Sequence, residues 1–391
     1  MIHPERLSGI VNPGIAAAIA AVGVFSLTIG LSYPLFSLIL EQMGLPAALI
    51  GLNAAMTPLG ILVSAPVIPE VARRVRGDVL AIVSVLAVSG LLILMGSLRD
   101  PLIWLGLRFL LGVAINTLYV LSETWINLLA PPAIRGRVIG VYGMVASAGF
   151  ALGPALLGIL GTGGILPFAV AAAITVLPVP LLMAAGRHLP PTGGEGRGGI
   201  LDFVRRAPIL LIAVGAFALF DQATLSLLPI YGLAVGMDET KAAFALTVLV
   251  AGNIVLQVPI GWLADHVRRR HVMAGLAGLA CLGALLLPLS VGHPVALWPL
   301  LFIWGAAGYG GYTVALTILG DRYSGQRLLA GNACFALMWG VGGIFGSPLA
   351  GRAMDQFGHN GLPGVLALLF AALALALVLF RLTVERDPRD G

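Results

Sequence analysis

The chain has 391 residues, of which 59% are hydrophobic and 10% are charged, and its formal net charge is +5. A soluble globular protein is about 45–50% apolar and about 25% charged, so no water-soluble fold could bury this much apolar surface. The composition therefore excludes a soluble protein and indicates that the solvent of this chain is lipid.

Apolar segments long enough to cross a bilayer recur along the chain, each ended by a Gly/Pro break or a cluster of charges. A spanning helix needs about 20 apolar residues, whereas the strands of a membrane barrel alternate apolar and polar residues over about 10 positions. The segments have the length and uniformity of helices, and the first is too long for a cleaved signal peptide. We predict an all-α membrane protein with twelve transmembrane helices, at residues 13–37, 46–69, 78–97, 102–127, 138–160, 165–184, 208–233, 241–262, 272–291, 295–319, 328–350 and 362–381.

The basic residues predict how these helices are oriented. Eighteen of the 22 lie in the termini and loops of one side, whereas Arg99, Lys241 and Arg352 lie on the other side and Arg108 lies within a helix. Short cytoplasmic loops carry the excess of Lys and Arg in membrane proteins, so both termini are expected in the cytoplasm. The basic residues are scattered rather than gathered in one run, so they do not indicate a nucleic-acid partner.

The two halves of the chain repeat each other at an offset of 195 residues. Pro34 aligns with Pro229, Glu70 with Asp265 and Arg74 with Arg269. The polar stretch RHLPPTGGEGRGG between the halves is typical of a flexible linker. We predict two pseudo-symmetric six-helix bundles, at residues 1–186 and 208–391, joined by a cytoplasmic linker at 187–207.

The charged loop GWLADHVRRR in the second half resembles the signature G-x-L-A-D-R-x-G-R-R of the major facilitator superfamily of secondary transporters. The loop departs from the signature at His266 and Arg268, and it matches at Gly261, Leu263, Ala264, Asp265, Arg269 and Arg270. The copy in the first half, PVIPEVARRV, keeps only an acid and two arginines, which are Glu70, Arg73 and Arg74.

Three further segments carry the same resemblance. Arg108 and Gly112 fit the family's R-x-x-x-G pattern in the fourth helix. The fifth helix fits the family's glycine–proline pattern at Gly140, Gly149, Gly153, Pro154 and Gly158, with Leu157 in place of one glycine. The segment LSETWINLLAPPAIRGRVIGVYGM is similar to a YcaD-like bacterial subgroup of the family.

The resemblance implies a secondary transporter in which two bundles rock about a substrate site near the middle of the bilayer. The fifth-helix pattern is associated in the family with proton-driven antiporters, so protons are the expected coupling partner and export is favoured over import. The expected partners are a small-molecule substrate and the lipid bilayer, with no cofactor. We expect a monomer in the bacterial cytoplasmic (inner) membrane.

The charged loops are interpreted as a cytoplasmic latch. Asp265 would lie near the start of the eleventh helix, where the helix dipole favours an anion, and Arg269 could reach Asp321 at the end of the tenth helix. In the first half, Glu70 with Arg73 or Arg74 would do the same with Glu123. Such contacts would favour the outward-facing state and break as the halves rock. The alternative is that these arginines only enforce the topology.

Ionisable residues at membrane depth are candidates for function because burying a charge there is costly. Asp221 lies about 20 Å from the cytoplasmic end of the seventh helix, and Arg108 lies about 10 Å into the fourth helix from the opposite side, at 1.5 Å per residue. Asp221 is the favoured proton-coupling acid; alternatively it binds substrate as an anion or is a structural partner of Arg108 or of neighbouring polar groups. Glu123, near the cytoplasmic face, has latch, proton-transfer and surface-acid alternatives.

Polar and aromatic residues of the helices are candidates to line the substrate cavity, although each alone is more often a helix–helix hydrogen bond. These candidates are Tyr33, Asn53, Asn116, Tyr119, Tyr142, Gln222, Asn253, Gln257, Tyr309, Tyr312, Asn332 and Trp339. Gly149, Gly153, Pro154 and Gly158 form either a gating hinge or a close-packing surface.

The sequence shows no nucleotide-binding P-loop, no metal-ligand spacing and no nucleophile–base arrangement, so we expect neither an enzyme nor a metal site. A sparse cavity with tyrosines and few charges favours an amphipathic or weakly charged solute. Two function classes remain: a proton-coupled secondary transporter, and a transporter-like membrane protein that acts without transport as an assembly factor or sensor.

Overall fold

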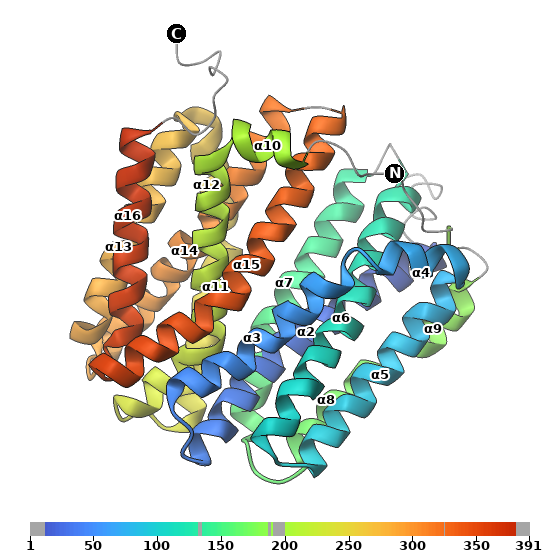
Figure 1. The fold of residues 1–391 in the computed structure, drawn as a ribbon, viewed down its shortest axis with the longest axis horizontal. Helices are drawn as coiled ribbons and strands as arrows, with labels where there is room; N and C mark the ends of the chain where they lie inside the picture. The colour runs from blue at the N-terminus through green and yellow to red at the C-terminus, as the bar shows by residue number, and fades with distance from the viewer. Residues whose placement is uncertain (1–11, 132–134, 187–188, 191–199, 324, 381–391) are drawn as a thin grey trace, which may run out of the picture. The chain divides into compact units, whose positions relative to one another are not determined.

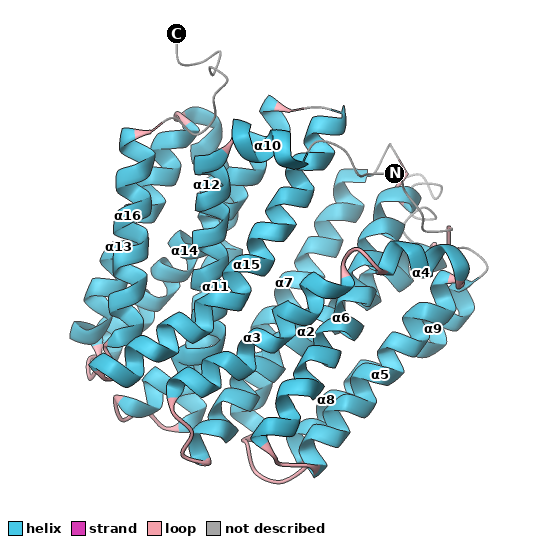
Figure 2. Cartoon of the chain, in the orientation of Figure 1, coloured by secondary structure: helices cyan, strands magenta, loops and turns pink. Residues whose placement is uncertain are grey.

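The computed structural model describes residues 12–131, 135–186, 189–190, 200–323 and 325–380, and within these ranges it contains helices and no strands (Figures 1 and 2). The helices are α2 (Pro13–Gln42), α3 (Ala47–Ser64), α4 (Ile68–Arg74), α5 (Gly77–Ser97), α6 (Pro101–Leu129), α7 (Arg135–Leu160), α8 (Leu166–Val176), α9 (Val179–Ala185), α10 (Ile200–Arg206), α11 (Pro208–Ala234), α12 (Glu239–His266), α13 (Arg269–Ser290), α14 (Pro294–Arg322), α15 (Gly325–Phe357) and α16 (Gly361–Leu379). Twelve spans, with α8 and α9 forming one of them, are long and apolar enough to cross a membrane. The prediction of an all-α protein with twelve transmembrane helices is confirmed.

The helices depart from the predicted ranges where proline or a charge interrupts the apolar pattern. The second predicted span, 46–69, is interrupted after Ser64, and its charged end becomes the separate helix α4. A residue that precedes proline is pushed out of the helical region, which explains a break near Pro66. The sixth span is interrupted at Leu177 and Pro178, which both keep helical dihedral angles, because Pro178 has no N–H to donate within the helix. In contrast, α2 and α15 continue several residues past the predicted ends, because a helix does not stop where its apolar run stops.

The predicted linker at 187–207 contains a helix at its end. Phe203 of α10 is buried, and its ring lies 5.0 Å from that of Tyr323 in an edge-to-face arrangement. Figure 1 shows α10 beside the start of α15, with which it is in contact. The stretch 200–206 is therefore a packed helix, while most of the preceding Pro- and Gly-rich stretch lies outside the described residues.

The chain folds into two compact units, which are described separately. The first contains Met1–Phe36 and Met56–Gly194, and the second contains Ser37–Ala55 and Glu195–Gly391. Most of the second unit is the sequence half that follows the linker. The segment Ser37–Ala55, which we call the hairpin tip because it joins the ends of α2 and α3, belongs to the second unit although it comes from the first sequence half.

The repeat is visible in how equivalent helices meet. In the first unit, α3 and α6 approach through Gly60, which lies against the Phe109 carbonyl, and Gly112, which lies against the Thr57 carbonyl. In the second unit, α12 and α14 approach through Gly252 against Phe302 and Gly305 against Leu249. A side chain at any of these four glycines would collide with the facing backbone. The same reciprocal glycine contact therefore holds the second and fourth helices of both halves together.

The turns that follow the first helix of each half also repeat. Gly44, between α2 and α3, has a φ of 76°, and Gly236, between α11 and α12, has a φ of 89°. Both turns require the left-handed backbone that glycine adopts without steric cost. The α12 turn ends at Asp238, which accepts a hydrogen bond from the backbone N–H of Lys241 at 2.8 Å. The side chain and the N–H of Lys241 lower the pKa of Asp238 below its ordinary value.

The glycine contacts make a stability prediction. Gly305→Val should lower the melting temperature of the purified protein strongly, because overpacking a tight contact costs about 1–3 kcal/mol and the atom that Gly305 faces belongs to rigid backbone. Gly278→Val is the matched control, because no heavy atom lies within 4 Å of a side chain built there. Equal melting temperatures for the two variants would contradict the role of Gly305 in the α12–α14 contact.

Candidate functional site

Asp221 lies at the centre of α11, a helix whose residues are buried nearly without interruption from Leu210 to Gly232. The side chain is itself buried, with an exposed fraction of 8%. Its Oδ2 atom accepts a hydrogen bond of 2.9 Å from Nε2 of Gln222. Tyr309 of α14 lies close enough to interact with the carboxyl group, although its hydroxyl forms no hydrogen bond of standard geometry within the described part of the chain.

Two neighbouring helices fix the position of Asp221. On one side, the ring of Phe220 packs edge-to-face against that of Tyr309 of α14, with centroids 5.4 Å apart. On the other side, Ser347 of α15 donates a hydrogen bond of 2.8 Å to the Gln222 carbonyl and exchanges one of 2.9 Å with Ser226. These side-chain bonds tie α11 to α15 directly after Asp221.

The site contains a buried hydrogen-bond acceptor that lacks a donor. Gln222 Oε1 is buried and has no partner among the described residues. Within the described residues of its own unit, no basic side chain pairs with Asp221. Such acceptors call for a donor, because a buried polar atom without a partner costs about 1–3 kcal/mol. The arrangement can therefore accept a proton or a hydrogen-bond donor of a substrate.

Arg108 of α6, in the first unit, is fully buried but is held by aromatic rings. Its guanidinium carbon lies 4.7 Å from the ring centroid of Tyr33 and 5.0 Å from that of Phe36. Its Nε atom donates a hydrogen bond of 3.3 Å to the hydroxyl of Thr57 in α3. Asp221 and Arg108 belong to different units, so their predicted pairing stays a prediction.

The latch residues of the first half pair with one another rather than with Glu123. Both Arg73 and Arg74 form salt bridges with Glu70, the second with an N–O distance of 2.7 Å. No ion pair with Glu123 occurs among the described residues, and the expected latch contact with Glu123 stays a prediction. The pairing has a local reason: α4 places Glu70 three and four residues before the arginines on one helix face, so the charges are satisfied within the helix.

Glu123 is exposed near the end of α6, and its backbone carbonyl accepts a hydrogen bond of 2.8 Å from Asn127. Its latch, proton-transfer and surface-acid roles all stay predictions.

In the second half, Arg269 joins three helices inside one unit. It forms a salt bridge with Asp321, donates a hydrogen bond of 3.2 Å to the carbonyl of Thr317, and lies 3.9 Å from the carboxylate of Asp265. The structure thus brings Arg269 and Asp321 together. The side chain of Asp265 is 65% exposed, and its predicted contact with the start of the eleventh helix falls around Ser324, outside the described residues.

The sequence analysis gave no structural role to Arg270, the last residue of the signature. Its guanidinium donates hydrogen bonds to the carbonyls of Leu377 and Val378 at the end of α16. The last carbonyls of a helix have no partner within the helix, so Arg270 caps α16 from another element. Its place in the signature is the only sequence signal that singles it out.

Several cavity candidates take part in packing between helices. Asn116 donates hydrogen bonds to the Ile61 carbonyl at 3.0 Å and to the Ser64 hydroxyl at 2.9 Å, which ties α6 to α3. The remaining contacts are those of Tyr142 with Ser122, Gln257 with Thr313, Tyr119 with Phe25, and Tyr312 with Trp339. Asn53 is buried and Asn332 is exposed. Among the candidates, Gln222 and Tyr309 interact with Asp221.

The fifth-helix glycines lie on a close contact with α2. Gly149 faces Ser26 and Leu27, and Gly153 faces the backbone of Gly30 and Leu31. Helix α7 continues through Pro154 and Gly158 to Leu160 without a break. This arrangement supports the close-packing alternative, and a hinge role remains a prediction.

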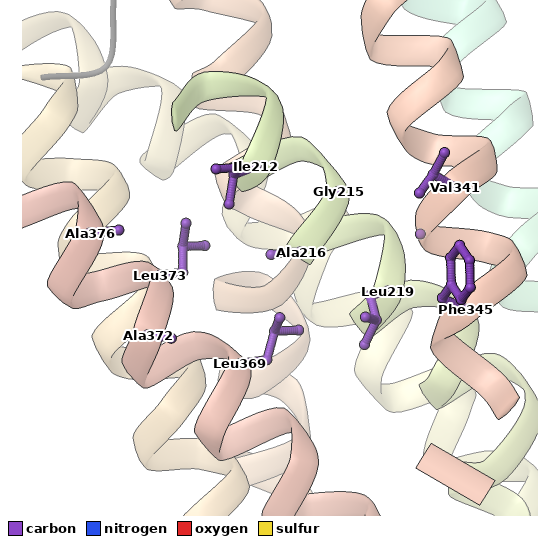
Figure 3. A pocket seen from close by; sticks show the side chains of 11 residues that line it. Ile212, Gly215, Ala216, Leu219, Val341, Phe345, Leu369, Ala372, Leu373 and Ala376 are labelled. Carbon is purple, nitrogen blue, oxygen red and sulfur yellow. The ribbon is translucent and has the colours of Figure 1, made fainter. Parts of the chain in front are cut away.

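An apolar cavity of about 440 Å³ lies between α11, α15 and α16 of the second unit. Figure 3 shows its lining, which includes Leu219, Phe345 and Leu373 and contains no charged or hydrogen-bonding side chain. None of the predicted cavity residues lines it. The polar chemistry of this unit therefore lies around Asp221 and not in this cavity.

Known proteins resemble this chain along most of its length. The sequence model of the Major Facilitator Superfamily matches residues 18–251 and 210–391. The uncharacterized MFS-type transporter YfkF of Bacillus subtilis is 26% identical over 373 residues, which cover 92% of this chain and 93% of the relative. The uncharacterized MFS-type transporter YcaD of Escherichia fergusonii is 26% identical over 289 residues, which cover 73% and 72%.

Solved structures share the fold. The nucleoside transporter NupG superposes with a TM-score of 0.77 at 12% identity, covering 95% of this chain and 100% of that one. A D-xylose-proton symporter superposes with a TM-score of 0.75 at 16% identity, covering 95% and 98%.

The environment of Arg108 predicts that lysine cannot replace it. Arg108→Lys should lower the stability of the purified protein by about 1–2 kcal/mol, because an ammonium group lacks the planar face that stacks on an aromatic ring. The check is the melting temperature in detergent, with Arg99→Lys as the control, since Arg99 is exposed and bonds to a loop carbonyl. A lysine variant as stable as the parent would show that the stacking contributes little.

Proposed function

The chain belongs to the major facilitator superfamily, and we propose that it is a proton-coupled secondary transporter that exports a small solute across the bacterial cytoplasmic membrane. The family match and the twelve apolar spans among the described residues show a multi-pass membrane protein of a transporter family. Proton coupling, the kind of solute and the direction are the proposed parts.

The observation that carries proton coupling is the buried carboxyl group of Asp221. Burial disfavours the charged form of a carboxyl group, so its protonation depends on whether water reaches it. A helix rearrangement that hydrates such a site in one state and dries it in another couples proton binding to transport. The D-xylose-proton symporter, by its name, couples protons to transport on the same fold, which supports the proposal.

The neighbours of Asp221 support a weakly charged, amphipathic solute. Tyr309 and Phe220 offer aromatic surface, while Gln222 and Asp221 offer buried oxygen atoms that accept hydrogen bonds. A solute with an apolar body and one or two donor groups would satisfy these oxygens without requiring a charged partner. The fifth-helix pattern supports export.

We also propose a cytoplasmic latch in the second half of the chain. Arg269 and Asp321 meet within one unit, so their salt bridge steadies the ends of α13 and α14. Asp265 is then the exposed carboxylate that can meet the start of α15 on the cytoplasmic side, and its release would accompany the rocking of the halves.

Cysteine labelling tests the proposed orientation. In intact cells, a membrane-impermeant maleimide should label Asn360→Cys, which lies in the turn before α16, and should not label Arg74→Cys, at the end of α4. The excess of arginine on one side predicts this difference, because that side stays in the cytoplasm. Labelling of position 74 from outside, with position 360 protected, would reverse the topology.

Substitution of Asp221 tests the coupling. A ligand screen that follows the melting temperature first identifies a solute, since a ligand that binds the native state stabilises it. In vesicles with an imposed pH gradient, Asp221→Asn should abolish uphill accumulation of that solute and leave its downhill exchange largely intact. Asp221→Glu should retain part of the uphill activity because it keeps a carboxyl group.

The control is Asp238→Asn, which removes an exposed acid of the same unit outside both the Asp221 site and the latch. Uphill accumulation by Asp221→Asn would place the coupling elsewhere, with Glu123 as the next residue to change. The absence of flux for every stabilising ligand would favour the alternative of a membrane protein that acts without transport.

A further inference from the structure

The N-terminus of α3 is capped by a residue 308 positions away in the sequence. Asp355, near the end of α15, accepts hydrogen bonds from the backbone N–H groups of Ala47 at 2.8 Å and Ala48 at 3.0 Å, one with each carboxylate oxygen. The first N–H groups of a helix have no partner within the helix, and a negative charge is favourable there. The residues before α3 are Gly44, Leu45 and Pro46, and none has a side chain that could serve as a cap.

The same two helices also touch along their backbones. Gly351 of α15 lies against the carbonyl of Ala47, and Gly51 of α3 lies against the carbonyl of Ser347. The two contacts are one helical turn apart on each helix, and they have the same reciprocal form as the contacts between α12 and α14. The hairpin tip, Ser37–Ala55, is therefore seated on α15 by a fitted surface and a double hydrogen bond.

One charge of the tip opposes this seating. The carboxyl group of Glu41, at the end of α2, lies close enough to Asp355 to repel it. Gln42, the next residue, donates a hydrogen bond to the carboxylate of Glu239 in α12. The nearby Lys241 forms its salt bridge with Asp238 at 2.9 Å. The contact between the tip and α15 thus combines two hydrogen bonds of Asp355 with its repulsion by Glu41. Because the repulsion offsets part of the hydrogen-bond energy, the contact can be released.

We propose that Asp355 is a positioning residue of the transport cycle: it fastens the hairpin tip to α15, and its release frees the tip to move. The proposed topology places this contact on the extracytoplasmic side. This inference rests on the transport function proposed above. Its test measures how accessible the tip is to a labelling reagent, so no substrate is needed.

A buried cysteine reports the release. Ser37 lies in the tip, one turn before Glu41, is fully buried, and its hydroxyl has no partner among the described residues, so Ser37→Cys is a small change. The reporter is placed in a full-length chain whose own Cys281 and Cys334 are replaced by alanine. The rate at which a membrane-impermeant maleimide modifies it in proteoliposomes measures how often the tip opens.

Asp355→Ala should raise this labelling rate about tenfold, which corresponds to about 1.4 kcal/mol and to the usual loss of a helix cap. Asp355→Asn keeps one acceptor and should give an intermediate rate. Glu41→Gln should lower the rate below that of the parent, because it removes the repulsion. A contact that only stabilised the fold would lower the melting temperature without moving these rates in opposite directions.

Asp238→Ala is the matched control, because Asp238 also caps a helix of this unit but caps its own helix, α12. The proposal is overturned if Asp355→Ala leaves the labelling rate unchanged, or if Asp238→Ala raises it equally. Should Asp355→Ala fail to fold, the Asp355→Asn and Glu41→Gln pair decides. Failure of the coupling role of Asp221 would appear in the flux experiment and would leave these labelling rates unaffected.

Discussion

Close approach of helix backbones at glycine is the constraint on which this structure depends. In lipid there is little hydrophobic gain in pressing one apolar helix against another, so association relies on van der Waals contact and hydrogen bonds between helices. Gly60, Gly112, Gly252 and Gly305 supply that contact at equivalent crossings in both units. Once these crossings are fixed, the side chains around them, including Tyr309 one turn beyond Gly305, have fixed positions too.

The two ionisable groups at membrane depth solve the cost of burial in different ways. Arg108 is stacked on the rings of Tyr33 and Phe36 and donates a hydrogen bond to Thr57. These aromatic and polar groups stabilise its buried positive charge. Asp221 receives a hydrogen bond from Gln222, whose own side-chain oxygen Oε1 lacks a partner within the described residues. The first environment suits a permanent cation, whereas the second suits a group whose protonation changes.

Hydropathy was sufficient to predict the twelve spans and the fold class, because the bilayer imposes a length and an apolar composition on each helix. The apolar pattern did not predict the helix break near Pro66, which makes α4 a separate helix. It also did not predict that Glu70 forms its salt bridges within α4, with Arg73 and Arg74. Contacts over long sequence distance were missed as well. Nothing in the sequence near Ala47 indicates Asp355, and nothing near Arg270 indicates the end of α16, since both bonds are made to backbone groups.

The repeat separates what the fold requires from what this chain has added. Ser26 occupies the position in the first half that Asp221 occupies in the second. Ser26 is fully buried, donates a hydrogen bond of 2.8 Å to the carbonyl of Val22 in its own helix, and lies against Gly149 of α7. Helix packing at this position therefore requires no more than a small side chain, such as serine, whose hydroxyl bonds to the backbone of its own helix. A carboxyl group in the equivalent position of α11 adds a burial cost that the fold does not demand, and this cost is best explained by a function for the acid.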